Sequence, residues 1–166
     1  MFEKFGEFNS AEELNMAAEG FLGEQDIDSL MKLAEENGIE KEDAEDYADG
    51  LSKELVGETM AALGRLKVFR EDAGREKDTG MRFAMQTILK FTETLVVAEP
   101  EMASAVMLKG KRISEIAGAM RQSARDNGGV SCGTDRQLEG IIRAYYLEGK
   151  KAMKKIIAEL GKGEQG

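Results

Sequence analysis

The chain has 166 residues, enough for one domain of ordinary size or for a domain with a small appendage. Charged residues make up 33% of it, so the core must form from elements with broad solvated faces. Because histidine is absent and Cys132 is the single cysteine, the composition excludes imidazole catalysis, a disulfide framework and zinc sites of the usual nitrogen and sulfur type. We therefore expect no enzyme activity, no cofactor and no metal.

The first residues do not resemble a secretion signal. Glu3, Lys4 and Glu7 interrupt any early apolar run, and no stretch approaches the roughly 18 consecutive apolar residues of a membrane span. A single free thiol suits a reducing compartment. We expect a cytoplasmic protein with no membrane partner.

The net charge of −9 is distributed unevenly along the chain. Residues 1–50 contain 16 acidic and 3 basic side chains, which gives −13, whereas residues 51–166 contain 16 acidic and 20 basic side chains, which gives +4. This asymmetry predicts an acidic N-terminal helical module over residues 1–50 and a mildly basic helical bundle domain over residues 51–166.

Three short helices are predicted in the acidic module. Ser10 with Glu13 forms a capping-box pattern before an apolar face that runs to Leu22. Asp26 caps a second helix that stops at Asn37-Gly38, and a third covers roughly residues 41–49. We expect a strip of three aromatic residues to dock on this core, namely Phe2, Phe5 and Phe8.

The remaining segments also have helical periodicity. Apolar residues predict a first helix from Leu51 to Phe69, weakened by Gly57 and Gly64. Further helices are predicted over 81–97, 100–109, 113–125, 134–147 and 150–160, with Pro100 in a first turn and Thr134 with Gln137 as a second capping box. The tail from Gly161 is expected to fray. The predicted fold is an all-α, compact helical bundle.

The first candidate site is an acidic segment. Eight carboxylates fall within fifteen residues and can imitate nucleic-acid phosphates, entering a basic channel and displacing the nucleic acid. The alternative is an ordinary solvated helical face. The eight residues are Glu35, Glu36, Glu40, Glu42, Asp43, Glu45, Asp46 and Asp49.

Two basic features support an alternative site for nucleic acid. Lysines at i, i+4 spacing form a stripe that can contact phosphates, although lysines near a helix end also stabilise the helix dipole. A helix-turn-helix can be drawn from residues 112–126 and 134–147, but its connection is longer than the usual three or four residues. The residues concerned are Arg136, Arg143, Lys150, Lys151, Lys154 and Lys155.

Tyr145 and Tyr146 form the most prominent aromatic pair. At helical spacing, one ring is expected to be buried while its neighbour points about 100° away and contacts a partner. Cys132 lies in a glycine-rich loop and is interpreted as a small loop residue.

The C-terminal third resembles a known family. Residues 113–149 read ISEIAGAMRQSARDNGGVSCGTDRQLEGIIRAYYLEG, and this pattern of helix, glycine-rich turn, Thr-Asp cap and final tyrosine pair looks like the PcfK-like proteins of Gram-positive conjugative elements. That family overlaps with anti-CRISPR inhibitors of type II CRISPR effector nucleases. The chain has Ala144 where members often carry histidine. The phrases FNSAEELN and LAEENGIEKEDAEDYADG are similar to small acidic modules in proteins of gut Firmicutes mobile elements.

The resemblance implies a mobile-element protein that binds a CRISPR effector nuclease or its guide-RNA complex and blocks nucleic-acid engagement. Two other functions stay open: a DNA-binding accessory of a conjugative element that uses the basic body, and an adaptor or structural module with no link to nucleic acid. The charge asymmetry is compatible with acidic mimicry in the first case.

Overall fold

Every regular element is helical in the part of the chain that the computed structural model describes, which is residues 1–127 and 133–165. No strand occurs in these residues, so the prediction of an all-α fold is confirmed. The helices are α1 (Ala11–Gly23), α2 (Ile27–Glu36), α3 (Lys41–Ala48), α4 (Glu58–Ala73), α5 (Thr79–Ala98), α6 (Pro100–Val106), α7 (Ile113–Asp126), α8 (Asp135–Arg143), the π-helix η1 (Ala144–Glu148) and α9 (Lys150–Gln165).

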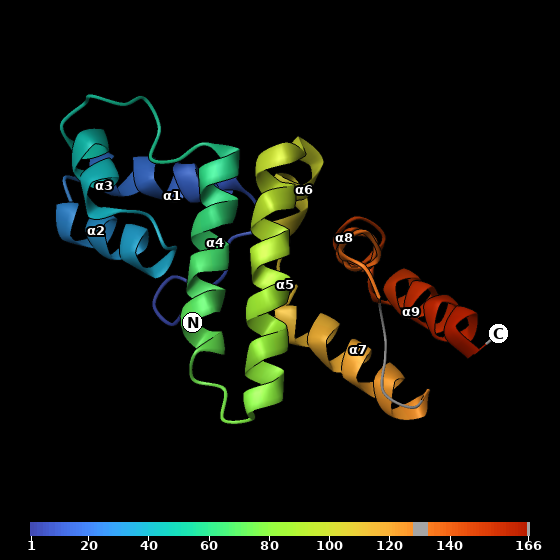
Figure 1. Ribbon diagram of the computed structural model, residues 1–166. Coiled ribbons are helices and arrows are strands. Elements are labelled where there is room, and N and C mark those ends of the chain that lie inside the picture. Colours follow the sequence, from blue (N-terminus) through green and yellow to red (C-terminus); the bar gives the residue numbers. More distant parts are fainter. Residues whose placement is uncertain (128–132, 166) are drawn as a thin grey trace.

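Helices α4 and α5 form the centre of the molecule. They pack side by side, and Figure 1 shows α1, α2 and α3 on the α4 side and α7, α8 and α9 on the α5 side. Helix α6 packs against both central helices and against η1. A single cluster of buried apolar side chains extends through all of these elements.

The predicted helix starts are confirmed at three caps. The side chains of Ser10, Asp26 and Thr134 accept hydrogen bonds from backbone amides in the first turns of α1, α2 and α8, and Thr134 with Gln137 completes a capping box. At α1 the carboxylate of Glu13 accepts instead from the amide of Asn9, at 2.8 Å.

Two predicted helix boundaries are wrong. The helix expected from Leu51 begins at Glu58, because Gly57 has an extended backbone and the preceding residues form a loop. The expected fraying from Gly161 is not observed, since α9 continues to Gln165. Gly161 lies close to the side chain of Asn127 at the end of α7, where an added Cβ would come within 2.5 Å of the side-chain amide nitrogen.

The N-terminal aromatic residues dock as expected. Phe2 is buried with its ring edge against Phe69 of α4, at 6.4 Å between ring centroids, and Phe5 contacts Phe21 of α1 in the same way at 5.4 Å. Phe8 is partly buried against the same core. The first 50 residues thus share a core with α4, and the domain boundary at Gly50 stays a prediction.

The turn between α2 and α3 approaches the backbone of α4 closely. A Cβ added to Gly38 would lie 2.2 Å from the carbonyl oxygen of Gly64, and a Cβ added to Gly64 would lie 2.5 Å from the carbonyl oxygen of Asn37. Gly38 also has a φ of +69°. Gly64, which the sequence presents as a weakness in the helix, is therefore the position that lets the turn reach α4.

Candidate partner-binding site

The exposed side of α3 carries a group of unpaired carboxylates. Ala44 and Tyr47 of α3 are buried in the core, whereas most of the acidic side chains of this helix lie on its exposed side. Four acidic side chains are exposed there, and within the described residues no Lys, Arg or amino terminus lies within 4.0 Å of them. We call this group the acidic face: Glu42, Asp43, Asp46 and Asp49.

The other four predicted carboxylates have different surroundings. Glu36 accepts hydrogen bonds from the backbone amides of Lys4 and Phe5, both at 3.2 Å, and so fixes the N-terminal segment. Glu40 pairs with Lys67 at 2.7 Å, and Glu45 pairs with Lys41 at 3.5 Å. Glu35 is exposed on α2. The eight carboxylates therefore do not form one uniform array.

The prediction that one of the two tyrosine rings is exposed is wrong. Tyr145 is 1% exposed and Tyr146 is 2% exposed, because η1 lies among α6, α8 and α9, which cover both of its sides. The Tyr145 hydroxyl accepts a hydrogen bond from the amide of Arg112 at 2.8 Å, and its backbone carbonyl accepts from Lys111. Burial raises the pKa of the Tyr146 hydroxyl far above its ordinary value. Neither ring can contact a partner in this conformation.

The two arginines of the alternative nucleic-acid site lie in different settings. Arg143 holds Glu99 in a bidentate ion pair, with its Nη2 atom 2.7 Å from Oε1, and also lies 3.7 Å from Glu139. Hydrogen bonds from Arg143 lower the pKa of Glu99. Arg143 therefore ties α8 to the start of α6, whereas Arg136 is exposed at the beginning of α8.

The lysine stripe follows the exposed side of α9. Lys150 pairs with Glu115 of α7 at 3.3 Å, whereas Lys151, Lys154 and Lys155 are exposed and have no carboxylate within 4.0 Å among the described residues. Lys150 and Lys154 also line a cleft of about 620 Å³ between α7 and α9. Small side chains of both helices, including Gly118 and Ala158, leave this space open.

The predicted helix-turn-helix is only partly visible. Its two helices exist as α7 and α8, and each packs against α5. The connection over residues 128–132, with Cys132, lies outside the described residues. The helix-turn-helix therefore stays a prediction.

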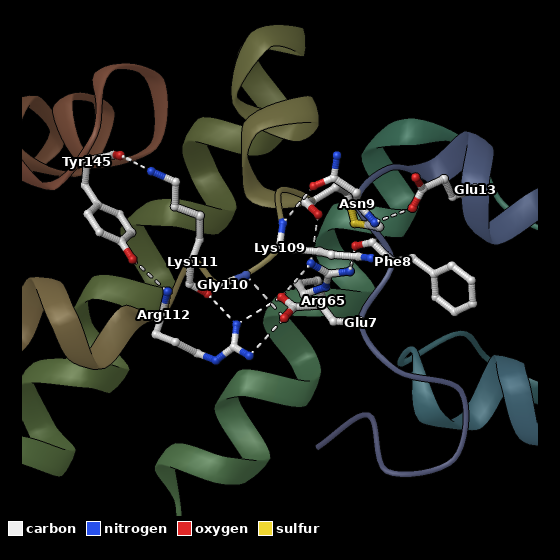
Figure 2. A network of polar contacts seen from close by, with 11 residues as sticks. Glu7, Phe8, Asn9, Glu13, Arg65, Lys109, Gly110, Lys111, Arg112 and Tyr145 are labelled. Atoms are coloured by element: carbon white, nitrogen blue, oxygen red, sulfur yellow. Dashed lines mark hydrogen bonds and ion pairs between the residues drawn. The ribbon is translucent and has the colours of Figure 1, made fainter.

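A buried ionic network joins four parts of the chain. It was not predicted from the sequence. Arg65 of α4 is 1% exposed and donates hydrogen bonds to Glu7 at 3.1 Å, to the carbonyl of Phe8 at 2.5 Å and to the carbonyl of Met107 at 2.9 Å. Arg112 donates two hydrogen bonds of 2.9 Å to the same Glu7 carboxylate. Figure 2 shows Glu7 between the two guanidinium groups. Arg65 lies on the apolar side of its helix between Ala62 and Leu66. An arginine on an apolar helix face is the sequence feature that could have indicated a buried ion pair.

The network predicts an acid-sensitive fold. Burial by itself raises the pKa of Glu7, but hydrogen bonds from Arg112 and Gly110 and the charges of Arg112 and Arg65 outweigh it and hold the pKa below its ordinary value. A lowered folded-state pKa contributes stability above the unfolded-state pKa and loses it as the pH falls through the folded-state value. We expect the unfolding free energy, measured in urea, to fall less steeply below about pH 4.5 in Glu7→Gln than in the unchanged protein. Equal slopes would contradict this role of Glu7.

No candidate metal centre is found among the described residues. No group of three or more Asp, Glu, Cys or His side chains in residues 1–127 and 133–165 is arranged to hold a metal ion. None of the helices in that part of the chain is long and apolar enough to cross a membrane. Comparison with protein-family models, with curated proteins and with solved structures gives no match for this chain.

Proposed function

We propose that the protein is an inhibitor without catalytic activity that binds a type II CRISPR effector nuclease or its guide-RNA complex and blocks its nucleic-acid engagement. The observation that carries the proposal is the acidic face of Glu42, Asp43, Asp46 and Asp49. Its members protrude from a helix whose opposite side is anchored in the core. A carboxylate array on a rigid helix loses little conformational freedom on binding.

The charge density of this face is comparable with that of nucleic acid. Residues 42 to 49 extend about 10 Å along the axis at about 1.5 Å per residue, so the four carboxylates lie about 3.5 Å apart on average along that axis. A single DNA strand carries about one phosphate charge per 3.4 Å, and both strands together carry about one per 1.7 Å. A surface that binds DNA through Lys and Arg can therefore attract this face by the same long-range field.

The nuclease as partner comes from the resemblance of residues 113–149 to the PcfK-like and anti-CRISPR proteins. RNA-guided nucleases hold their heteroduplex in basic channels and read a short duplex motif with arginine side chains. Such a surface has the charge that the acidic face requires. By mimicking nucleic acid, the acidic face would then exclude DNA from the nuclease, and the inhibitor would need no catalytic activity.

Charge reversal tests the acidic face. We expect the fourfold variant Glu42→Lys, Asp43→Lys, Asp46→Lys and Asp49→Lys to bind the guide-loaded nuclease at least about tenfold more weakly, because attraction becomes repulsion. A matched control reverses four other exposed acidic residues, which changes the net charge equally: Asp72, Glu101, Glu148 and Glu159. Equal weakening in the two variants would assign the effect to net charge and contradict the proposal.

A DNA-binding accessory of conjugation is the second candidate. It is favoured by Lys151, Lys154 and Lys155, which are exposed on α9. Binding to duplex DNA alone, lost on replacing these three lysines with Gln, would support it over the inhibitor. An adaptor without a link to nucleic acid predicts binding to neither DNA nor the nuclease.

A further inference from the structure

The loop between α3 and α4 builds a groove against α1. Asn15 of α1 holds both backbone polar groups of Val56: its amide nitrogen donates to the carbonyl at 2.7 Å, and its side-chain oxygen accepts from the amide at 3.1 Å. Beside this clamp lies a hollow of about 340 Å³ with Ala11, Met16 and Val56 among its apolar walls. Because Val56 is fixed by two hydrogen bonds, the hollow is preorganised.

Carboxylates surround this hollow, and no Lys or Arg side chain lines it. Glu12 and Glu19 come from α1, and Glu54 and Glu58 come from the loop and the first turn of α4. None of these four carboxylates has a cationic side chain within 4.0 Å in the described part of the chain. The hollow therefore requires positive charge from outside the molecule.

Two of the apolar residues of the groove are exposed methionines. Met16 is 64% exposed and lies between Glu12 and Glu19 on one side of α1, at i+4 and i+7. A second hollow, of about 140 Å³, shares Val56 and is lined by Met60, which is 55% exposed. Methionine is flexible and polarisable, and surfaces that accept amphipathic helices use it for this reason.

The groove is continuous with the acidic face. Asp43 lines the second hollow, so the two surfaces share a residue. Burial and, to a smaller extent, the charge of Glu19 raise the pKa of Tyr47 on α3, in agreement with a position of Glu19 on the same side of the molecule as α3. Lys67 also lines the second hollow, but it is paired with Glu40, so a bound segment in the groove would still adjoin the acidic face.

We propose that this groove, which we call the methionine groove, docks a basic amphipathic helix of the partner. Apolar side chains of that helix would contact Met16, Val56 and Met60, and flanking Lys or Arg side chains would pair with Glu12, Glu19, Glu54 and Glu58. A partner helix with apolar side chains at i, i+3 and i+4 and cations on either side of them would match α1, where Met16 lies between two glutamates. The inference rests on the proposed function for the identity of the partner, and it adds which part of the partner is recognised, namely a basic amphipathic helix.

The probe is a synthetic peptide of about 18 residues with leucine on one helical face and lysine on the other. We expect it to bind the full chain, and we expect the double variant Met16→Gln and Met60→Gln to weaken the affinity at least about tenfold. The double variant Glu12→Gln and Glu19→Gln should weaken it similarly. Phe83→Gln, a control at a 71% exposed residue of α5, should leave the affinity unchanged.

The groove would be overturned by no binding of the peptide, by equal binding of the peptide to all variants, or by equal binding of a scrambled peptide that has no apolar face. Loss of affinity in the glutamate variant alone would also overturn it, because this would show attraction without a groove. The nuclease titration separates this inference from the function. If peptide binding depends on the methionines while the unchanged protein does not bind the guide-loaded nuclease, the groove stands and the proposed function fails.

Discussion

Replacing Arg65 with methionine is expected to cost about 3–5 kcal/mol of unfolding free energy, the usual range when one partner of a buried ion pair is removed. Methionine matches the length of the arginine stem but donates no hydrogen bond. The carbonyls of Phe8 and Met107 would lose their guanidinium donor, and Glu7 would retain only Arg112. Urea unfolding followed by circular dichroism measures the loss.

A surface arginine on the same helix supplies the control. Arg70 pairs with Glu93 at 2.5 Å, but its side chain is 46% exposed. Exposed ion pairs contribute about 0–1 kcal/mol, so Arg70→Met should have a small effect. If the two variants unfolded at the same urea concentration, the Glu7–Arg65 network would not hold the N-terminal segment to the body.

The second large effect is expected at the contact between Gly38 and Gly64. Gly38→Ala should cost about 2–4 kcal/mol, because a side chain at positive φ costs roughly 1–2 kcal/mol and the new Cβ overlaps a backbone atom. Gly64→Ala should cost about 1–3 kcal/mol in spite of its gain in helix propensity, because Asn37 must move. Thermal unfolding measures both values.

Gly20 is the matched control for this contact. It also lies inside a helix, but nothing lies within 4 Å of a Cβ added there. Gly20→Ala should therefore stabilise the protein by about 0.5–1 kcal/mol. Stabilisation by Gly64→Ala of the same size would show that the turn does not press against α4.

Local sequence signals located most of the helices because their causes are local. The caps at Ser10, Asp26 and Thr134 and the stop at Asn37-Gly38 each depend on neighbouring residues, and all of them are observed. The error at Leu51 has a nonlocal cause. Val56 is held by Asn15, 41 residues earlier, so the chain before α4 forms a loop although its apolar spacing suits a helix.

The candidate site could be predicted only in outline. Charge counting located the acidic segment, but it could not tell Glu36, which binds backbone amides, from Asp46, which faces solvent. The prediction of one exposed tyrosine was wrong because η1 packs against α6, α8 and α9. These tertiary contacts cannot be inferred from the local sequence. The methionine groove was missed since it combines α1 with a loop that the sequence assigns to a helix.

The central claim is that this chain binds a nucleic-acid-handling partner through its acidic side. The most direct measurement is an equilibrium titration against a guide-loaded type II effector nuclease at about 50 and 200 mM salt, with duplex DNA titrated in parallel. We expect tight binding to the nuclease that weakens as salt rises, and no binding to DNA alone. Absence of binding to the nuclease at either salt concentration would contradict the central claim.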